Sequence, residues 1–387
     1  MNTLAGHLQL RPGAPLPQSL RSTRRAWAEQ VSVGQPASAL PGLLAGLFSL
    51  CAHAHRAVSQ LALHAAEQAR SPDAATIATV EASLARETAL EHVRRLSLDW
   101  PMRLVGADSP QDLVAHARAT LHGCPLIGAS PSALPWAALR QWLQDHWLGM
   151  PALRWWADWQ AGGIGWLTAW SRRQGGWLPR LLHHARAADT PLPQLASAAL
   201  RPHAHEADLL ALGQALATQT GFALQPLWNG QVASTGPWAR LQPATPVTVG
   251  TAWGLLGSRL AELVRLCLSD LPEANGPAVL QAGALPTGPR RGLAWVETAR
   301  GLLIHQVALE PPVAGAPTRV LACQVLAPTE WNFHPRGVVA QSLSALPPEA
   351  PDLPARVGLL IAAFDPCVDY ELLPGGPGQA ARQVTHA

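Results

Sequence analysis

The clearest helical pattern of this sequence runs from Leu43 to Arg70, and it constrains the fold most. Small and apolar residues recur there at spacings of three and four, and no proline interrupts them. A second helix is expected from Asp73, a suitable N-cap, through Arg95, in a stretch rich in Ala, Glu and Leu. Further helices are expected over residues 110–123, 132–148 and 255–270. The chain is therefore predicted to be mainly helical.

Beyond residue 290 the pattern changes to short apolar runs separated by glycine and proline. The runs cover residues 293–296, 302–309 and 319–325, and their length indicates strands or hairpins. No internal repeat and no clear linker divides the sequence. We expect an α+β, mainly helical fold, with a single domain over residues 1–373 and a flexible C-terminal tail over residues 374–387.

Composition limits the class of protein. Hydrophobic residues make up 48% of the 387 residues and charged residues only 14%, which favours a sizeable core over disorder. The net charge of +3 comes with no basic stripe, so a nucleic-acid partner is not expected. The beginning of the sequence lacks the pattern of a secretory signal, and no run approaches the roughly 18 apolar residues of a membrane-spanning helix. These features predict a cytoplasmic protein.

The five cysteines are an odd number and include no C-x-x-C pair. This arrangement favours reduced thiols over a disulfide framework. It also argues against an ordinary zinc or iron–sulfur site built from local cysteine pairs.

Tryptophan is concentrated between Trp136 and Trp177, which hold nine of the 16 tryptophans. We interpret this cluster as core packing, because large aromatic side chains mostly fill interiors. An aromatic surface that contacts a partner is the alternative.

Two segments combine residues that bind metals or anions. Cys51 and His55 are four residues apart and would share one helix face, so that a thiolate binds a metal while the imidazole hydrogen-bonds to it. A buried cysteine beside an unrelated histidine is the alternative. In the segment Glu297–His305, Gly301 permits close backbone approach and Arg300 offers donors to an anion. A strand with an ordinary ion pair would look the same.

Two later segments have a similar character. Residues 328–337 place polar and aromatic side chains between two prolines, which indicates an ordered loop with a function. Residues 364–367 end an apolar run in a turn that presents Cys367. A loop thiol without a metal is the alternative for Cys367.

In order along the chain, these segments resemble the motifs of NiFe-hydrogenase large subunits. Five segments are similar to five family motifs: Leu4–Leu8 to E-G-H-L, Phe48–His55 to C-x-x-C-x-x-x-H, Glu297–His305 to E-A-P-R-G-x-L-x-H, Pro328–Arg336 to P-T-T-W-N-x-S-P-R, and Asp365–Leu373 to D-P-C-x-x-C-x-x-H. The resemblance implies a large-subunit-like fold.

The departures from these motifs affect the metal ligands. Phe48 and Tyr370 stand where the family has two of its four cysteines, and Leu373 stands where it has a histidine. Ala5 replaces the family's proton-transferring glutamate, and Ala299 replaces the proline before Arg300. With two thiols left of four, the resemblance implies neither nickel binding nor hydrogen turnover.

The remaining residues resemble the iron half of that site, and a large-subunit look-alike with few cysteines is similar to the HupK/HoxV family of hydrogenase accessory proteins. The resemblance implies a non-catalytic scaffold or metallochaperone that transiently carries the Fe(CN)2(CO) unit between maturation proteins and the hydrogenase large subunit. Soft thiolates suit low-spin iron, and buried cyanides need hydrogen-bond donors. The residues carried over are Cys51 and Cys367 as iron ligands, Arg300 and Thr329 as donors to the cyanides, and His55 and His305 as neighbours that support the ligands.

The assignment of Cys367 as an iron ligand is less direct than that of Cys51, because Cys367 matches a family position that serves nickel. Two alternatives stay open at this point. One is a metal-free chaperone that docks on hydrogenase maturation proteins, and the other is a divergent hydrogenase with altered ligands.

Overall fold

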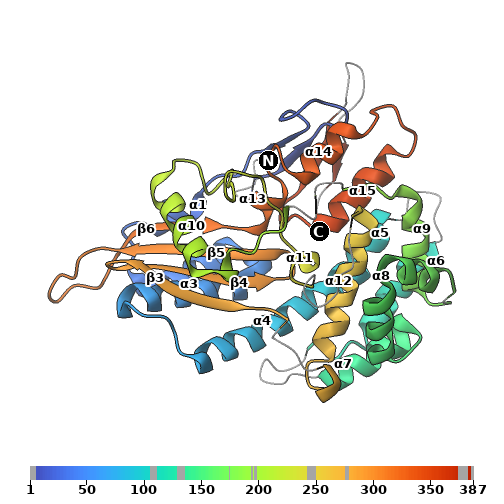
Figure 1. Ribbon diagram of the computed structural model, residues 1–387, viewed down its shortest axis with the longest axis horizontal. Helices are drawn as coiled ribbons and strands as arrows, with labels where there is room; N and C mark the ends of the chain where they lie inside the picture. Colours follow the sequence, from blue (N-terminus) through green and yellow to red (C-terminus); the bar gives the residue numbers. More distant parts are fainter. Residues whose placement is uncertain are drawn as a thin grey trace.

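The computed structural model describes residues 6–104, 111–128, 136–173, 175–192, 195, 198–241, 250–274, 279–373 and 382–384. Two four-stranded sheets and a group of helices make up this part of the chain (Figure 1). One sheet forms the left half in the view of Figure 1, and most of the helices lie on the right. The predicted α+β, mainly helical class is confirmed.

The larger sheet is an antiparallel meander in the order β3-β4-β5-β6. Helix α3 (Ala52–Gln68) covers one face, and α10 (Glu206–Thr218) lies on the other. At Gly292 the strand approaches α3 so closely that a Cβ atom would lie 2.2 Å from the carbonyl oxygen of Ala62, so only glycine fits. The strands are β3 (Ala282–Gly288), β4 (Arg291–Thr298), β5 (Gly301–Leu309) and β6 (Val320–Leu326).

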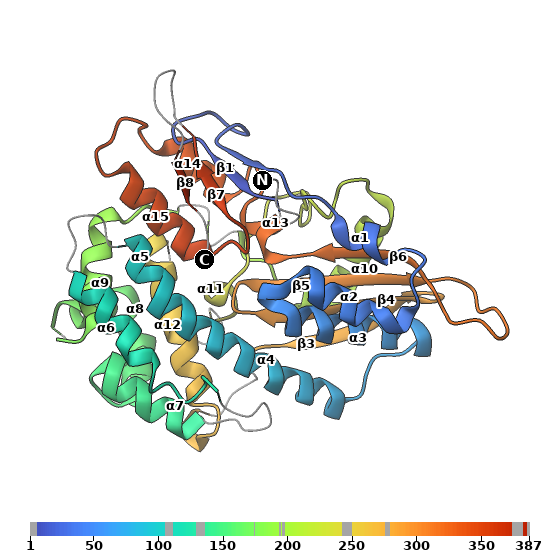
Figure 2. The ribbon, with the colours of Figure 1, turned by 180° about the vertical axis from the view of Figure 1, so that it is seen from behind.

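The smaller sheet joins the two ends of the chain. Its order is β2-β1-β7-β8, and β1 pairs in parallel with β7 (Figure 2). The parallel pairing brings the segment after residue 367 beside the first described residues. The strands are β1 (Leu8–Leu10), β2 (Leu20–Ser22), β7 (Tyr370–Leu372) and β8 (Arg382–Val384). Apart from β8, the predicted tail over residues 374–387 lies outside the described residues.

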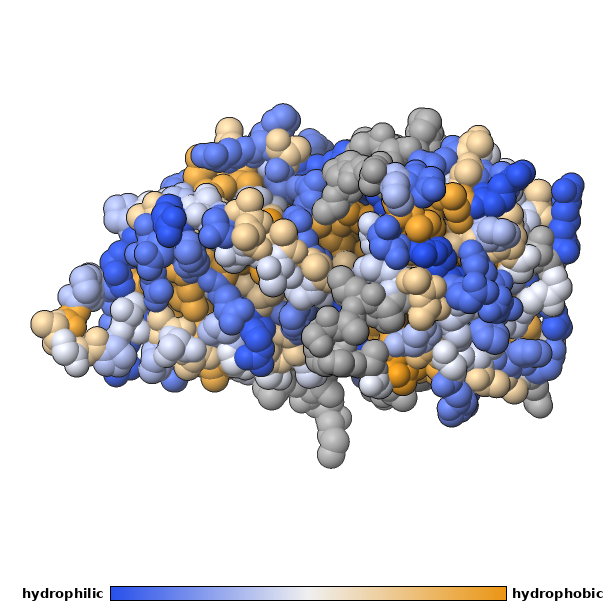
Figure 3. Space-filling view, turned by 90° about the horizontal axis from the view of Figure 1, so that it is seen from below, coloured by the Kyte–Doolittle hydropathy of each residue, from blue (hydrophilic) through white to orange (hydrophobic). Residues whose placement is uncertain are grey.

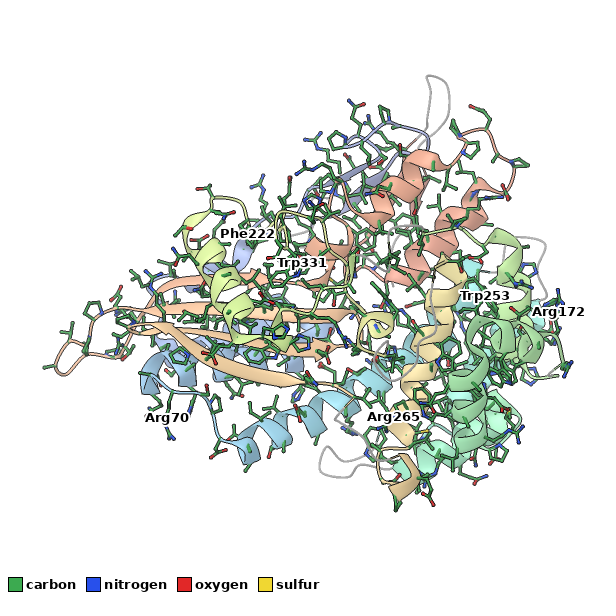
Figure 4. The ribbon with its side chains drawn as sticks, viewed as in Figure 1. Arg70, Arg172, Phe222, Trp253, Arg265 and Trp331 are labelled. Atoms are coloured by element: carbon green, nitrogen blue, oxygen red, sulfur yellow. The ribbon has the colours of Figure 1, made fainter. Side chains whose placement is uncertain are left out.

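The helical half is built around α12 (Ala252–Cys267), in which every residue except Arg265 is buried. Trp253, near the start of α12, is completely buried and donates its indole N–H to the carbonyl oxygen of Leu182 (Figure 4). Hydrophilic residues cover much of the face in Figure 3, with apolar ones scattered among them. The other helices are α1 (Trp27–Ser32), α2 (Leu40–Leu47), α4 (Ala74–Arg94), α5 (Trp100–Leu104), α6 (Gln111–Leu121), α7 (Trp136–Leu143), α8 (Ala152–Arg173), α9 (Trp177–Ala185), α11 (Pro237–Leu241), α13 (Pro328–Asn332), α14 (Val338–Ala345) and α15 (Leu353–Phe364).

The single helix predicted from Leu43 to Arg70 is wrong. The chain forms α2 and α3, bent by 106° about a short 3-10 turn at Ser49–Cys51. Phe48 leaves the helical conformation, with φ −112° and ψ 60°, and its ring stacks on His55 at 4.0 Å between centroids. Apolar residues keep helical spacing across the bend, so periodicity alone does not locate it.

Other sequence predictions are confirmed. Asp73 caps α4, accepting a 2.8 Å hydrogen bond from the backbone N–H of Thr76. The three predicted strands correspond to β4, β5 and β6, whereas β3 escaped notice because its sequence holds no β-branched residue other than Thr287. The short apolar runs over residues 338–346 and 355–363 lie in helices α14 and α15.

The tryptophan cluster is core, as predicted. Eight of the nine tryptophans between Trp136 and Trp177 are buried, and Trp166 is half-buried. Trp155 meets the rings of Trp166 and Trp170 edge-on, at 5.0 and 5.8 Å between centroids. Such edge-to-face pairs stabilise aromatic interiors.

Among the described residues, no single helix combines the length and apolarity needed to cross a membrane. The bent pair Ala37–Leu47 and Ser49–Gln68 reaches that length and composition only when its two parts are taken together.

Candidate metal centre

Cys51 and Cys367 line one pocket, although 315 residues separate them in sequence. The pocket has a volume of about 110 Å³, and both thiols are half-buried in its wall. The remaining wall is basic and apolar, and consists of Arg24, Arg25, Trp27, Leu47, Phe48, Ser49 and Leu50. We refer to this space as the thiol pocket.

Two bends in the chain and the pairing of strands β7, β1 and β2 bring these residues together. The break after α2 leaves Cys51 as the N-cap residue of α3. Helix α15 ends at Asp365 in the left-handed conformation, with φ 50° and ψ 70°, and the turn that follows presents Cys367. Strand β7 then pairs with β1, and β2 leads on to Arg24. The turn predicted to present Cys367 is therefore confirmed.

The predicted shared helix face of Cys51 and His55 is wrong. Cys51 has φ −133° and ψ 40°, which lie outside the helical region, because it precedes the first helical residue. His55 lies on α3 and is 1% exposed, with Phe48 of the pocket wall stacked on its ring.

His55 and His305 form a buried hydrogen-bonded chain with Ser59. His55 Nδ1 lies 3.0 Å from His305 Nε2, and His305 Nδ1 lies 3.2 Å from Ser59 Oγ. Burial lowers the pKa of His305 to about 3, and burial together with His305 keeps the pKa of His55 well below its ordinary value. Both imidazoles are neutral at pH 7, and their hydrogen bonds go to each other and to Ser59 rather than to a sulfur atom.

Thr329 contacts the sulfur of Cys367. Its Oγ1 lies 3.1 Å from Cys367 Sγ, and the residue is 3% exposed in the first turn of α13. The segment predicted as an ordered loop over residues 328–337 thus begins as a short helix.

Arg300 lies in the turn between β4 and β5, held by buried carboxylates. Its Nη2 donates to Glu91 Oε1 at 2.5 Å, and its Nε lies 3.3 Å from Asp365 Oδ2. Burial alone would lower the pKa of Arg300, but Asp365 and Glu91 outweigh it and raise this pKa. Burial and Cys367 raise the pKa of Cys51, and the charge of Arg300 opposes that rise. Arg300 is not among the residues that line the thiol pocket, and it forms the ion pairs that sequence reasoning had as an alternative.

The close approach predicted for Gly301 is real, but its partner is protein. Gly301 has φ +135°, and a Cβ atom there would lie 2.4 Å from Thr235 Cγ2. Only glycine fits this position, which starts β5 and fixes the turn that carries Arg300.

Arg24 was missed by the sequence reasoning. Its Nε donates to Glu330 Oε1 at 2.6 Å, and its Nη1 lies 3.7 Å from Cys367 Sγ. The pair Arg24-Arg25 just before α1 was the available signal, but nothing in the spacing links it to Cys367.

Glu87 on α4 was missed as well. Burial, followed by the neighbouring charge of Glu91, raises the pKa of Glu87 to about 7, and the backbone N–H groups of His53 and Ala54, just after Cys51, oppose that rise. The carboxylates of Glu87 and Glu91 lie one helical turn apart on α4.

The thiols are poor ligands for a bare ion. Burial raises the pKa of Cys51, and the nearby Cys367 raises it further. Within the described ranges, no group of three or more His, Cys, Asp or Glu residues is arranged to hold a metal ion. A bare ion would find only two sulfur ligands among the described residues that line the thiol pocket.

Fold and site together define a mainly helical α+β protein whose two ends meet at a two-thiol pocket flanked by arginines. Relatives place it more closely. It is 39% identical, over 95% of both chains, to the hydrogenase expression/formation protein HoxV of Cupriavidus necator. It is 31% identical to the hydrogenase expression/formation protein HupK of Bradyrhizobium diazoefficiens, over 88% of this chain and 87% of that one. The chain belongs to the HoxV/HupK family of hydrogenase expression/formation proteins.

Solved structures of hydrogenases are similar at low identity. A NAD⁺-reducing NiFe-hydrogenase matches with 15% identity and a TM-score of 0.47, over 90% of this chain and 91% of that one. A NiFeSe hydrogenase from Desulfovibrio vulgaris Hildenborough matches with 15% identity and a TM-score of 0.49, over 90% and 92%. Since both TM-scores lie below 0.5, no feature of these sites is carried over to this chain. No protein-family model matches the sequence.

Proposed function

We propose that this protein is a non-catalytic scaffold that carries the Fe(CN)2(CO) unit during maturation of a NiFe-hydrogenase large subunit. Membership of the HoxV/HupK family supports a role in hydrogenase maturation. The single observation that supports an iron cargo is the thiol pocket, in which Cys51 and Cys367 face one volume of about 110 Å³.

In this proposal the two thiolates bind the iron, and the protein supplies donors for the cyanides. A cyanide nitrogen that leaves water needs a hydrogen bond, because an unsatisfied buried acceptor costs about 1–3 kcal/mol. Arg300 Nε is buried and makes no hydrogen bond with a described residue, although it lies 3.3 Å from Asp365 Oδ2 in an ion pair. Thr329 places a hydroxyl beside Cys367. His55 and His305 support the Phe48 side of the pocket through the ring stack and the hydrogen bond between them.

The residues that replace the lost cysteines support a cargo without nickel. Phe48 is part of the pocket wall, and Tyr370 is buried in β7 with the guanidinium of Arg103 5.9 Å from its ring centre. Neither side chain is a ligand for nickel in a thiolate site. On this ground we propose that the protein passes iron between hydrogenase maturation proteins and the large subunit without turning over hydrogen.

A metal-free adaptor for the same maturation proteins is the second candidate. Its support is the lack of three clustered metal-binding side chains in the described part of the chain.

An infrared spectrum of the anaerobically isolated protein, produced together with its maturation partners, tests the proposal. Bands of metal-bound CO and cyanide are expected for the natural protein and for Cys124→Ser, whose thiol is buried away from the pocket. The bands should be lost in Cys51→Ser and in Cys367→Ser. Absence of the bands from a fully assembled preparation, or their survival in both pocket variants, would favour the metal-free adaptor.

A further inference from the structure

A second and larger cavity adjoins the thiol pocket. It has a volume of about 450 Å³, within the range of roughly 300–1,000 Å³ that is common for binding sites. Arg24 lines both spaces, and Thr329, which also lines the larger cavity, touches Cys367. We call this space the β2 cavity, because β2 forms one of its walls.

The β2 cavity runs along an unpaired strand edge. Leu8 and Leu10 on β1 direct backbone groups toward β7. The N–H of Leu8 donates to the carbonyl oxygen of Asp369, and the carbonyl oxygen of Leu10 accepts from the N–H of Leu373. The residues opposite them on β2 are Ser22 and Leu20. In an antiparallel pair, such residues turn their N–H and C=O groups away from the partner strand. Among the described strands β2 pairs only with β1, so Leu20 and Ser22 turn their backbone groups away from the sheet. Ser22 is exposed, whereas Leu20 is buried, so the accessible part of this edge is at Ser22.

Side chains from both faces of β2 line this space, with Leu20 and Ser22 on one face and Arg21 on the other. Such a lining is expected where a cavity follows the edge of a strand. An extended segment placed there would continue the sheet by strand addition.

The charged side chains that line the β2 cavity indicate the charge of the segment that would bind there. Its charged lining consists of three arginines, Arg11, Arg21 and Arg24, and one carboxylate, Glu330. Arg24 is paired with Glu330, while Arg11 and Arg21 are exposed and form no ion pair with a described residue. The exposed guanidinium groups of Arg21 on β2 and of Arg11, just after β1, favour an acidic side chain between them.

The inner end of the cavity holds one more polar group. Glu330 Oε2 is buried and has no hydrogen-bond partner in the described part of the chain, whereas Oε1 accepts from Arg24. A backbone N–H of an inserted segment would satisfy this oxygen.

We propose that the β2 cavity binds an extended, acidic segment of a partner protein, which adds to the free edge of β2 and reaches Arg24 and Thr329 beside Cys367. The segment thereby contacts the two side chains that touch the Cys367 sulfur. That link to the cargo rests on the proposed function, whereas binding of the segment does not.

The test uses the metal-free full chain and a fluorescein-labelled octapeptide of alternating valine and glutamate, measured by fluorescence anisotropy. Saturable binding is expected, together with slower hydrogen exchange at the amide of the exposed Ser22. Two kinds of control peptide should each bind at least tenfold more weakly. One is the matched valine–lysine peptide, which reverses the charge. The other is the valine–glutamate peptide with every second backbone amide N-methylated, made in both registers, which removes backbone donors. The infrared test of the iron cargo is independent, so failure here leaves that proposal standing.

Substitutions locate the binding. Arg21→Glu should weaken the valine–glutamate peptide at least tenfold, whereas Arg172→Glu should change its affinity less than twofold. The control substitution Arg172→Glu makes the same change of charge at an exposed residue near the end of α8, in the helical half (Figure 4). Equal binding of the lysine or N-methylated peptides, or equal effects of the two substitutions, would overturn the proposal. The proposal would also be overturned if the chain bound no peptide but formed a dimer that Arg21→Glu dissociates. The occupant of the cavity would then be a second copy of this chain.

Discussion

The hydroxyl of Thr329 and the sulfur of Cys367 lie 3.1 Å apart, so the proposed cyanide donor contacts one of the two proposed iron ligands. Either atom can be the donor. When a thiolate binds a metal, a hydroxyl at this distance would donate to the sulfur or turn toward another acceptor in the pocket.

Replacing Thr329 by valine removes the hydroxyl and keeps the shape of the side chain. The loaded protein should then show shifted cyanide and CO infrared bands, because the hydrogen bond to the sulfur or to a cyanide is lost. Thr329→Ser keeps the hydroxyl and should retain the original spectrum. Band positions that are identical in all three proteins would exclude a contact between Thr329 and the cargo or its ligands.

Arg300 should matter for folding as well as for the cargo. Its guanidinium is buried against Glu91 and Asp365, and removal of one partner from a buried ion pair costs about 3–5 kcal/mol. Arg300→Gln is therefore expected to lower the unfolding free energy of the metal-free protein by that amount, measured by urea denaturation. The control Arg172→Gln replaces an exposed arginine and should stay within about 0.5 kcal/mol of the natural protein. A loss below about 1 kcal/mol for Arg300→Gln would show that the network is not stabilising.

The sequence identified residues that lie together at the thiol pocket, but it did not predict the geometry that brings them there. The order of the motifs brought out Cys51, Cys367, Arg300 and Thr329, because each sits in a short recognisable pattern. The bend at Phe48 was not predictable, because apolar spacing continues through it and the stack on His55 is a tertiary contact.

Contacts between residues far apart in the sequence were not predicted for the same reason. Arg24 and Glu330 are 306 residues apart, and their contact joins the segment after β2 to α13. The pKa of Glu87 depends on Glu91 and on burial between helices, and no pattern near Cys51 signals it. Contacts that depend on how elements pack leave no local pattern in the chain.

The buried carboxylate of Glu262 should make stability depend on acid. Burial alone would raise the pKa of Glu262, but Arg240 and the hydrogen bond from His92 outweigh it and lower this pKa to about 2. A carboxylate with a lowered pKa stabilises the fold above its ordinary value of 4.5, and the contribution is lost as pH falls through about 2. We expect the unfolding free energy to fall between pH 4.5 and pH 2, by at most about 1.4 kcal/mol per pH unit from this group.

The variant Glu262→Gln isolates this contribution. It should be less stable at pH 7, because Arg240 then loses its charged partner, and its stability should change less steeply below pH 4.5. Urea midpoints measured from pH 7 to pH 3 compare the two slopes. Parallel slopes would mean that Glu262 has the same pKa in the folded and the unfolded chain.

The ion pair between Arg24 and Glu330 should be strongly coupled, and a double-mutant cycle measures this. Only 11% of the Arg24 side chain and 7% of the Glu330 side chain is exposed, so either charge left alone is costly. We expect Arg24→Gln and Glu330→Gln each to destabilise the metal-free protein by about 3 kcal/mol. The double variant should lose at least 1 kcal/mol less than the two single losses added together.

Arg154 and Asp158 on α8 provide the matched control for this cycle. This pair joins the same kinds of group at 2.9 Å, but 69% of the Arg154 side chain is exposed. Its coupling free energy should be below about 0.5 kcal/mol, because exposed pairs one helical turn apart are screened by water. Coupling of similar size in both cycles would mean that water reaches the Arg24–Glu330 pair, and that the wall between the thiol pocket and the β2 cavity is open in solution.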